Sequence, residues 1–129
     1  METAQQFIKR KENQFQEDLK KNKKISMKDI GRKTKMFFIR EAWTFMVQSN
    51  LDKKVFMVER LKKHEVDKEK LAYPESWDVG AIEYRISYWI VGQIGNKQNK
   101  WTFGSFCPII PEKDFDKLIN QAKKEKTIK

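Results

Sequence analysis

The residue types that most often carry out chemistry are scarce in this sequence. It contains a single histidine, His64, and a single cysteine, Cys107, so the usual zinc ligand sets cannot be assembled from its residues. His64 lies in the charged run 62–65, which is typical of a solvated surface. Cys107 follows Phe106 and precedes Pro108, and this apolar setting predicts a buried, unreactive thiol. We therefore expect no metal site and no cofactor.

One group of charged residues loosely follows the pattern of metal-dependent nucleases. Asp78 precedes Glu83 and Arg85, which lie two positions apart at the start of an expected strand. Two carboxylates could hold a divalent ion while a cation stabilises the attacking hydroxide. The polar face of a strand carries such residues by default, however, and an arginine stays protonated, so it could act only electrostatically. A metal-dependent nuclease is therefore the weaker hypothesis, and a non-enzymatic protein is expected.

Basic residues gather in the first third of the chain. Residues 1–35 contain eleven Lys and Arg against five Asp and Glu, which accounts for +6 of the total net charge of +10. Clustered cations bind nucleic acids by neutralising phosphates and releasing counterions, although an excess of lysine can also serve solubility alone. The predicted phosphate contacts are Lys20, Lys21, Lys23, Lys24, Arg32, Lys33 and Lys35.

A second route to nucleic acid would use a sheet surface. Arg85 and Trp89 fall on the same, more polar face of an expected strand. An exposed tryptophan beside an arginine would offer a stacking surface and a cation to single strands. The alternative is that a helix covers Trp89, because tryptophan is usually well buried in folded proteins. Both interpretations stay open at the level of the sequence.

Helical patterns are expected in the basic N-terminal region that carries these lysines. Thr3 and Gln6 have the spacing of a capping box. The apolar residues that follow fall near one stripe of a helix and are Phe7, Ile8, Phe15 and Leu19. A second, shorter helix is expected to start at Ser26 and to end at Gly31, where glycine tolerates a left-handed conformation.

The segment 36–47 fits either a helix or a strand. Its alanine, methionine, arginine and glutamate residues are good helix formers, which narrowly favours a helix. Asn50 could cap a further helix in which Leu51, Val55, Val58 and Leu61 are in register, and 55–58 could equally be a short strand.

The clearest pattern is a hairpin over residues 82–110. Apolar and polar residues alternate along 82–94, residues 95–100 form a polar turn, and 101–110 is the expected returning strand. A C-terminal helix should then start at Pro111, with acidic residues near its positive end.

Composition agrees with a single folded domain spanning all 129 residues. Charged residues make up 36 % of the chain, but the 12 % of aromatic residues argues against disorder. The longest uncharged stretches are 86–96 and 101–111, much shorter than the roughly 20 residues of a membrane span, and no secretory signal is recognised. We therefore expect a cytoplasmic protein without a membrane partner.

These patterns together predict an α+β protein. Its antiparallel sheet should contain the aromatic-rich hairpin and pack against N-terminal basic helices and a C-terminal helix. The leading functional hypothesis is a small, non-enzymatic protein that binds DNA or RNA. The alternative is a protein-interaction or assembly module, in which aromatic residues form a surface for a protein partner or a homo-oligomer.

Overall fold

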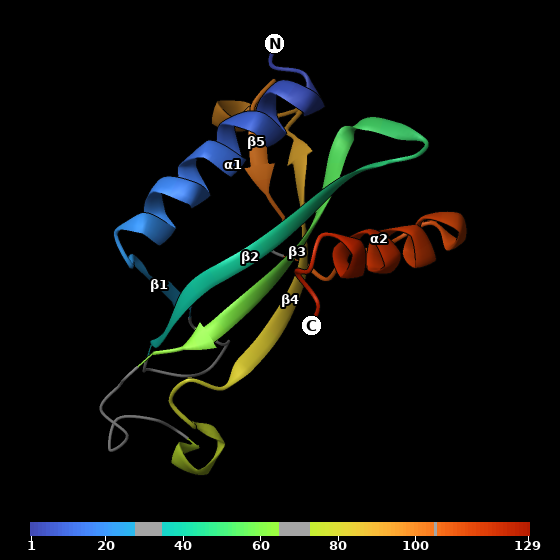
Figure 1. The fold of residues 1–129 in the computed structure, drawn as a ribbon. Coiled ribbons are helices and arrows are strands. Elements are labelled where there is room, and N and C mark those ends of the chain that lie inside the picture. The colour runs from blue at the N-terminus through green and yellow to red at the C-terminus, as the bar shows by residue number, and fades with distance from the viewer. Residues whose placement is uncertain (28–34, 65–72, 105) are drawn as a thin grey trace.

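The computed structural model describes residues 1–27, 35–64, 73–104 and 106–129. These residues form an α+β fold, as expected, in which five strands make one antiparallel, curled sheet in the order β1-β2-β3-β4-β5 (Figure 1). The elements are α1 (Ala4–Lys20), β1 (Lys24–Met27), β2 (Met36–Gln48), β3 (Leu51–Lys63), the 3₁₀ turn η2 (Pro74–Ser76), β4 (Ile82–Val91), the 3₁₀ turn η3 (Gly95–Lys97), β5 (Trp101–Phe103) and α2 (Glu112–Lys124).

Helix α1 begins at the predicted capping box. The Gln6 amide donates to Thr3 Oγ1 at 3.1 Å, and the Thr3 amide donates to Gln6 Oε1 at 2.9 Å. Two backbone donors that a helix start leaves unpaired are thereby satisfied. Phe7 and Phe15 are buried, which confirms the predicted apolar stripe. No helix in the described part of the chain is long and apolar enough to cross a bilayer.

The expected helix over 36–47 is wrong, because this segment is strand β2. It forms a long hairpin with β3, in which Phe45 lies opposite Met57. Asn50 belongs to the short connection between the strands and does not cap a helix, so the helical alternative for 51–61 is wrong as well. The reason is that both faces of the hairpin are covered. A strand covered on both faces loses the apolar and polar alternation by which strands are recognised.

The helix expected to start at Ser26 is also wrong for its first two residues. Ser26 and Met27 belong to β1, and Met27 pairs with Met36 of β2. Residues 28–34, which would have completed that helix, lie outside the described residues. In the described N-terminal region, one helix therefore stands where two were expected.

The predicted hairpin of 82–110 exists but its strands are shorter than expected. Strand β4 ends at Val91, and β5 comprises three residues, with Trp89 opposite Phe103. Gly104 follows so close to the Tyr88 ring that a side chain at this position would collide with it. Since the strand ends before Cys107, this thiol is exposed, and the expectation that it is buried is wrong.

The two helices cover opposite faces of the sheet (Figure 1). Helix α1 packs Phe7 and Phe15 against Val55 and Met57 of β3. Successive residues of a strand point to opposite sides, and Phe56 and Val58 accordingly contact Leu118 and Ala122 of α2. A third apolar cluster lies under β1 and contains Phe38, Leu61 and Trp77.

A bulge in β2 changes which side chains meet across the sheet. Arg40 pairs with Leu61 whereas Ala42 pairs with Arg60, so Glu41 is an extra residue. The extra residue shifts the alternation of β2 by one position, so even-numbered residues face one side of the sheet before the bulge and the opposite side after it. Arg40 therefore points to the α1 face, and Glu41 reaches Arg60 on the other face with an Nε–Oε1 distance of 3.2 Å.

Candidate nucleic-acid interface

Four of the predicted phosphate contacts gather where α1 turns into β1. We call Lys20, Lys21, Lys23 and Lys24 the lysine turn, and all four are exposed. Asn22 has a φ of 50°, a left-handed conformation that asparagine tolerates better than most residues. With Asn22 in this conformation, the Lys23 amide donates to the Asp18 carbonyl at 2.9 Å, which closes the helix end. The lysines thus sit on a well-defined helix terminus.

The lysine turn is only loosely neutralised by its acidic neighbours. Lys20 Nζ lies 3.5 Å from Glu17 Oε1, and Lys23 Nζ lies 3.9 Å from Asp18 Oδ1. Both pairs are long, both lysines are exposed, and Asp18 is the only half-buried member, so each pair contributes little to stability. Among the described residues, no acidic side chain forms an ion pair with Lys21 or Lys24. A phosphate could therefore take the place of Glu17 and Asp18 at little cost.

The other predicted N-terminal contacts do not join this turn in the described structure. Lys35 is exposed and precedes β2, whereas Lys24 lies opposite Ile39, at the far end of the short β1–β2 ladder. At about 3.3 Å per residue, the four positions from Lys35 to Ile39 place the two lysines roughly 13 Å apart along the strands. Arg32 and Lys33 lie outside the described residues.

Trp89 is packed beneath α1. Its ring centroid is 5.3 Å from that of Phe7 and 5.1 Å from that of Phe103. Lys11 Nζ lies over the indole, 4.4 Å from the ring centroid, and burial there lowers the pKa of this ammonium group. Helix α1 therefore covers Trp89, as the alternative interpretation held. In this position the indole is poorly placed to stack on bases.

Arg85 is engaged by a buried carboxylate. Glu59 is fully buried, and its Oε1 accepts from Arg85 Nε at 2.6 Å while its Oε2 accepts from Arg40 Nε at 2.7 Å. The β2 bulge is what brings Arg40 to this face. Arg85 also contacts the Phe103 ring at 5.1 Å from its centroid. We therefore assign Arg85 a role in the fold, as one half of the charge that balances Glu59.

The nuclease-like residues do not form a common site. Asp78 is exposed before β4, Glu83 pairs with Lys63 at 2.8 Å, and Arg85 faces Glu59. Within the described ranges, no three histidine, cysteine, aspartate or glutamate side chains are grouped so that they could hold a metal ion. The arrangement thus offers no support to the nuclease hypothesis.

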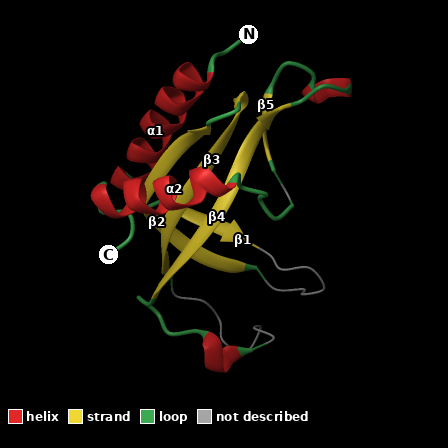
Figure 2. Ribbon diagram, turned by 90° about the vertical axis from the view of Figure 1, so that its right-hand side faces the viewer, coloured by secondary structure: helices red, strands yellow, loops and turns green. Residues whose placement is uncertain are grey.

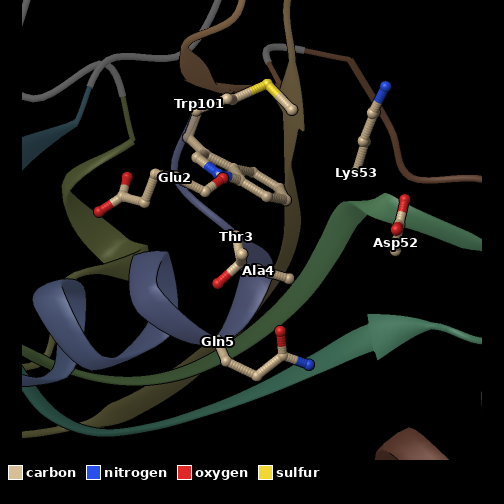
Figure 3. A pocket seen from close by; sticks show the side chains of 8 residues that line it. Glu2, Thr3, Ala4, Gln5, Asp52, Lys53 and Trp101 are labelled. Atoms are coloured by element: carbon tan, nitrogen blue, oxygen red, sulfur yellow. The ribbon is translucent and has the colours of Figure 1, made fainter.

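A hollow of about 190 Å³ lies at the N-terminal end of α1 (Figure 3). Its wall includes Glu2, Asp52, Lys53 and Trp101, whose Nε1 donates to the Glu2 carbonyl at 2.9 Å. The Glu2 carboxylate forms a hydrogen bond with Arg10 at 2.8 Å, which holds the pKa of Glu2 below its usual range. Arg10 balances Glu2, and Asp52 stands beside Lys53 in the lining, so the hollow lacks the cluster of cations that a polyanion requires.

Sequence reasoning missed the buried centre formed by Glu59 and its two arginines. The available signal was a glutamate inside the apolar run 55–61, since a charge in such a run requires a partner. The partners could not be assigned, because the bulge at Glu41 decides which residue of β2 faces Glu59. Likewise, the position of α1 over Trp89 depends on contacts between distant segments.

Comparisons with known proteins do not extend these observations. No family model matches the chain, and no curated protein or solved structure shows significant similarity to it.

Proposed function

We propose that this protein binds nucleic acid through the lysine turn, which contacts the phosphate backbone. The observation that carries the proposal is the exposure of four lysines at one closed helix end, namely Lys20, Lys21, Lys23 and Lys24. The ion pairs with which a phosphate would compete are long, at 3.5 and 3.9 Å. A net charge of +10 supports the proposal, because long-range attraction speeds the encounter with a polyanion. The proposal includes action in the cytoplasm, as expected from the sequence.

Fluorescence anisotropy with labelled single- and double-stranded DNA and RNA, titrated at several salt concentrations, tests this proposal. We expect the logarithm of affinity to fall linearly with the logarithm of salt concentration. Replacing all four residues of the lysine turn by glutamine should weaken binding. It should also reduce the slope by about 0.9 for each lost duplex contact, or about 0.7 for a single strand.

The matched control replaces four exposed lysines of α2 by glutamine, namely Lys113, Lys117, Lys123 and Lys124. Both variants lose four positive charges, so a difference between their affinities reflects the position of the lysines and not the net charge. Equal losses would contradict a local site at the lysine turn. The absence of binding even at low salt would overturn the proposed function.

A further inference from the structure

In the described part of the chain, the outer edge of β4 has no paired strand along more than half of its length. Strand β5 pairs with Trp89, Ile90 and Val91 only, although β4 starts at Ile82 (Figure 2). Within the described residues, no strand continues the pairing alongside 82–87 on this side. An open strand edge presents unpaired backbone donors and acceptors, to which another strand can add.

The hydrogen bonds on the two sides of β4 determine which of its backbone groups face outward. The Lys63 amide donates to the Ala81 carbonyl at 2.9 Å, so odd-numbered residues of β4 bond towards β3. The Gly104 amide donates to the Tyr88 carbonyl at 2.7 Å, so even-numbered residues bond towards the β5 side. Below Tyr88, the outward-facing amides and carbonyls are therefore those of Ile82, Tyr84 and Ile86.

The surroundings of this edge are accessible and apolar. A hollow of about 440 Å³ lies beside 85–87 and is lined on its other side by the segment that follows β5. Phe106 in that segment is 80 % exposed, and Tyr84 on the edge itself is 44 % exposed, with its hydroxyl accepting from the Lys129 amide at 3.1 Å. Exposed aromatic groups next to unpaired backbone are features of an interaction surface.

The charges on β4 favour one register. Glu83 keeps Lys63 and Arg85 keeps Glu59 as partners within the chain, but both side chains also reach solvent, with 55 % and 31 % of their surface exposed. In a twofold antiparallel pair of β4 strands, outward-facing even residues must lie opposite even residues. With Tyr84 opposite Tyr84 of a second copy, Glu83 lies opposite Arg85 of that copy, on the same side of the sheet. A shift in one direction would place Glu83 opposite Glu83, and a shift in the other would place Arg85 opposite Arg85. Like charges directly opposite destabilise a strand pair, whereas opposite charges stabilise it.

We infer that two copies of this chain form a dimer by pairing the open edges of β4, with Tyr84 at the twofold axis. Ile82 pairs with Ile86 of the second copy, so the side that faces α2 brings apolar residues together, while the other side brings Glu83 and Arg85 together. Gly104 sets the length of the interface, because β5 pairing ends there and leaves the remaining edge open.

Sedimentation over a range of protein concentrations tests the dimer. The wild type should show a reversible monomer–dimer equilibrium, and Glu83→Arg should raise its dissociation constant by about tenfold or more. Glu112→Arg, at an exposed position of α2, is the control with the same charge change and should leave the constant unchanged. Tyr84→Pro removes one outward-facing amide and should abolish the dimer, since proline is tolerated where an edge strand faces solvent. Circular dichroism establishes that each variant is folded.

Disulfide formation tests the register independently of these variants. In a Cys107→Ser background, Tyr84→Cys should cross-link two copies rapidly, because the Cα atoms of such a pair lie about 5.5 Å apart, within disulfide range. Glu83→Cys in the same background should cross-link slowly, because residue 83 faces residue 85. A strictly monomeric wild type, a dimer indifferent to both Glu83→Arg and Tyr84→Pro, or faster cross-linking at 83 than at 84 would each overturn the inference.

Discussion

The side chain of Glu59 carries a charge in the interior of the sheet, and its two oxygens accept from Arg40 and Arg85 at 2.7 and 2.6 Å. The arginines differ in exposure, 12 % for Arg40 and 31 % for Arg85, so the centre is sealed on the side of β2 and reaches solvent on the side of β4. A buried carboxylate in this setting is stable only while both arginines are present to offset its lost hydration.

We predict that Glu59→Gln destabilises the protein strongly. The glutamine keeps the size of the side chain but leaves two closely spaced guanidinium groups without their counter-charge. Breaking a buried ion pair in this way costs about 3–5 kcal/mol. Urea denaturation would measure the loss, with the exposed Glu75→Gln as a control that should unfold like the wild type. Coincident unfolding curves for Glu59→Gln and wild type would contradict this account.

Asp114 links α2 to the connection between β2 and β3. Its Oδ2 accepts from the Ser49 amide at 3.0 Å, and this hydrogen bond lowers the pKa of the buried carboxyl group. A lowered pKa means that the ionised form stabilises the fold. The contribution is present above the unfolded-state pKa and is lost as the pH falls through the lower, folded-state value.

Asp114→Asn should therefore be less stable than the wild type at neutral pH, and the difference should shrink in strong acid. Urea denaturation midpoints measured from neutral to strongly acidic pH would show whether the two curves converge. A difference that is independent of pH would mean that Asp114 acts through its shape and not through its charge.

At the scale of elements, local signals predicted some elements well and others not at all. Helix α1 was predictable because its capping box is a contact between residues three apart, Thr3 and Gln6. Strand β4 was predictable from its alternation, and α2 from the proline before it. Strands β2 and β3 were not predictable, because α1 and α2 cover opposite faces of this hairpin and both faces are apolar. A strand of this kind resembles a helix in its sequence.

The candidate site follows the same division. Exposure of the lysine turn follows from its own charge and from the helix end at Asn22, so its residues could be found in the sequence. The positions of Arg85 and Trp89 depend on Glu59 and on Phe7, which are far away in the chain. Neither the Arg85–Glu59 pair nor the Trp89–Phe7 contact produces a periodic pattern in the sequence. The packing of Arg85 and Trp89 leaves them poorly placed for stacking on bases.

We predict that Asn22→Ala costs about 1 kcal/mol of stability whereas Asn22→Gly costs much less. The φ of 50° at this residue strains any side chain that cannot compensate, and glycine adopts it freely. Urea denaturation of the two variants measures the difference. The glycine variant should also bind labelled oligonucleotides as the wild type does, because the helix end that carries the lysines is kept. Equal stability of the two variants would contradict the role of the left-handed turn.

At the scale of the whole molecule, the two proposed surfaces belong to different strands of the curled sheet, whose curl brings Met27, at the other end of β1 from Lys24, to within 3.5 Å of Arg85. The lysine turn leads into β1, the first strand of the sheet order, and the open edge belongs to β4 (Figure 1). No residue is shared between them, so a dimer formed through β4 would keep both lysine turns available. A long nucleic acid could then occupy two lysine turns at once, and the second contact would benefit from a high effective concentration.

This arrangement predicts that Tyr84→Pro weakens binding to long nucleic acids while leaving binding to short ones unchanged. The substitution alters neither the charge nor the lysine turn, so an oligonucleotide of about 10 nucleotides, enough for one small domain, should bind both proteins equally. On a strand several times longer, only the dimer can make two simultaneous contacts, and its advantage should lie in the usual range of avidity, about 10²- to 10⁴-fold. Anisotropy titrations at one low salt concentration would measure both lengths. Equal losses on both lengths would place the damage at the binding site itself, and no loss on either would show that dimerisation serves a purpose other than binding nucleic acid.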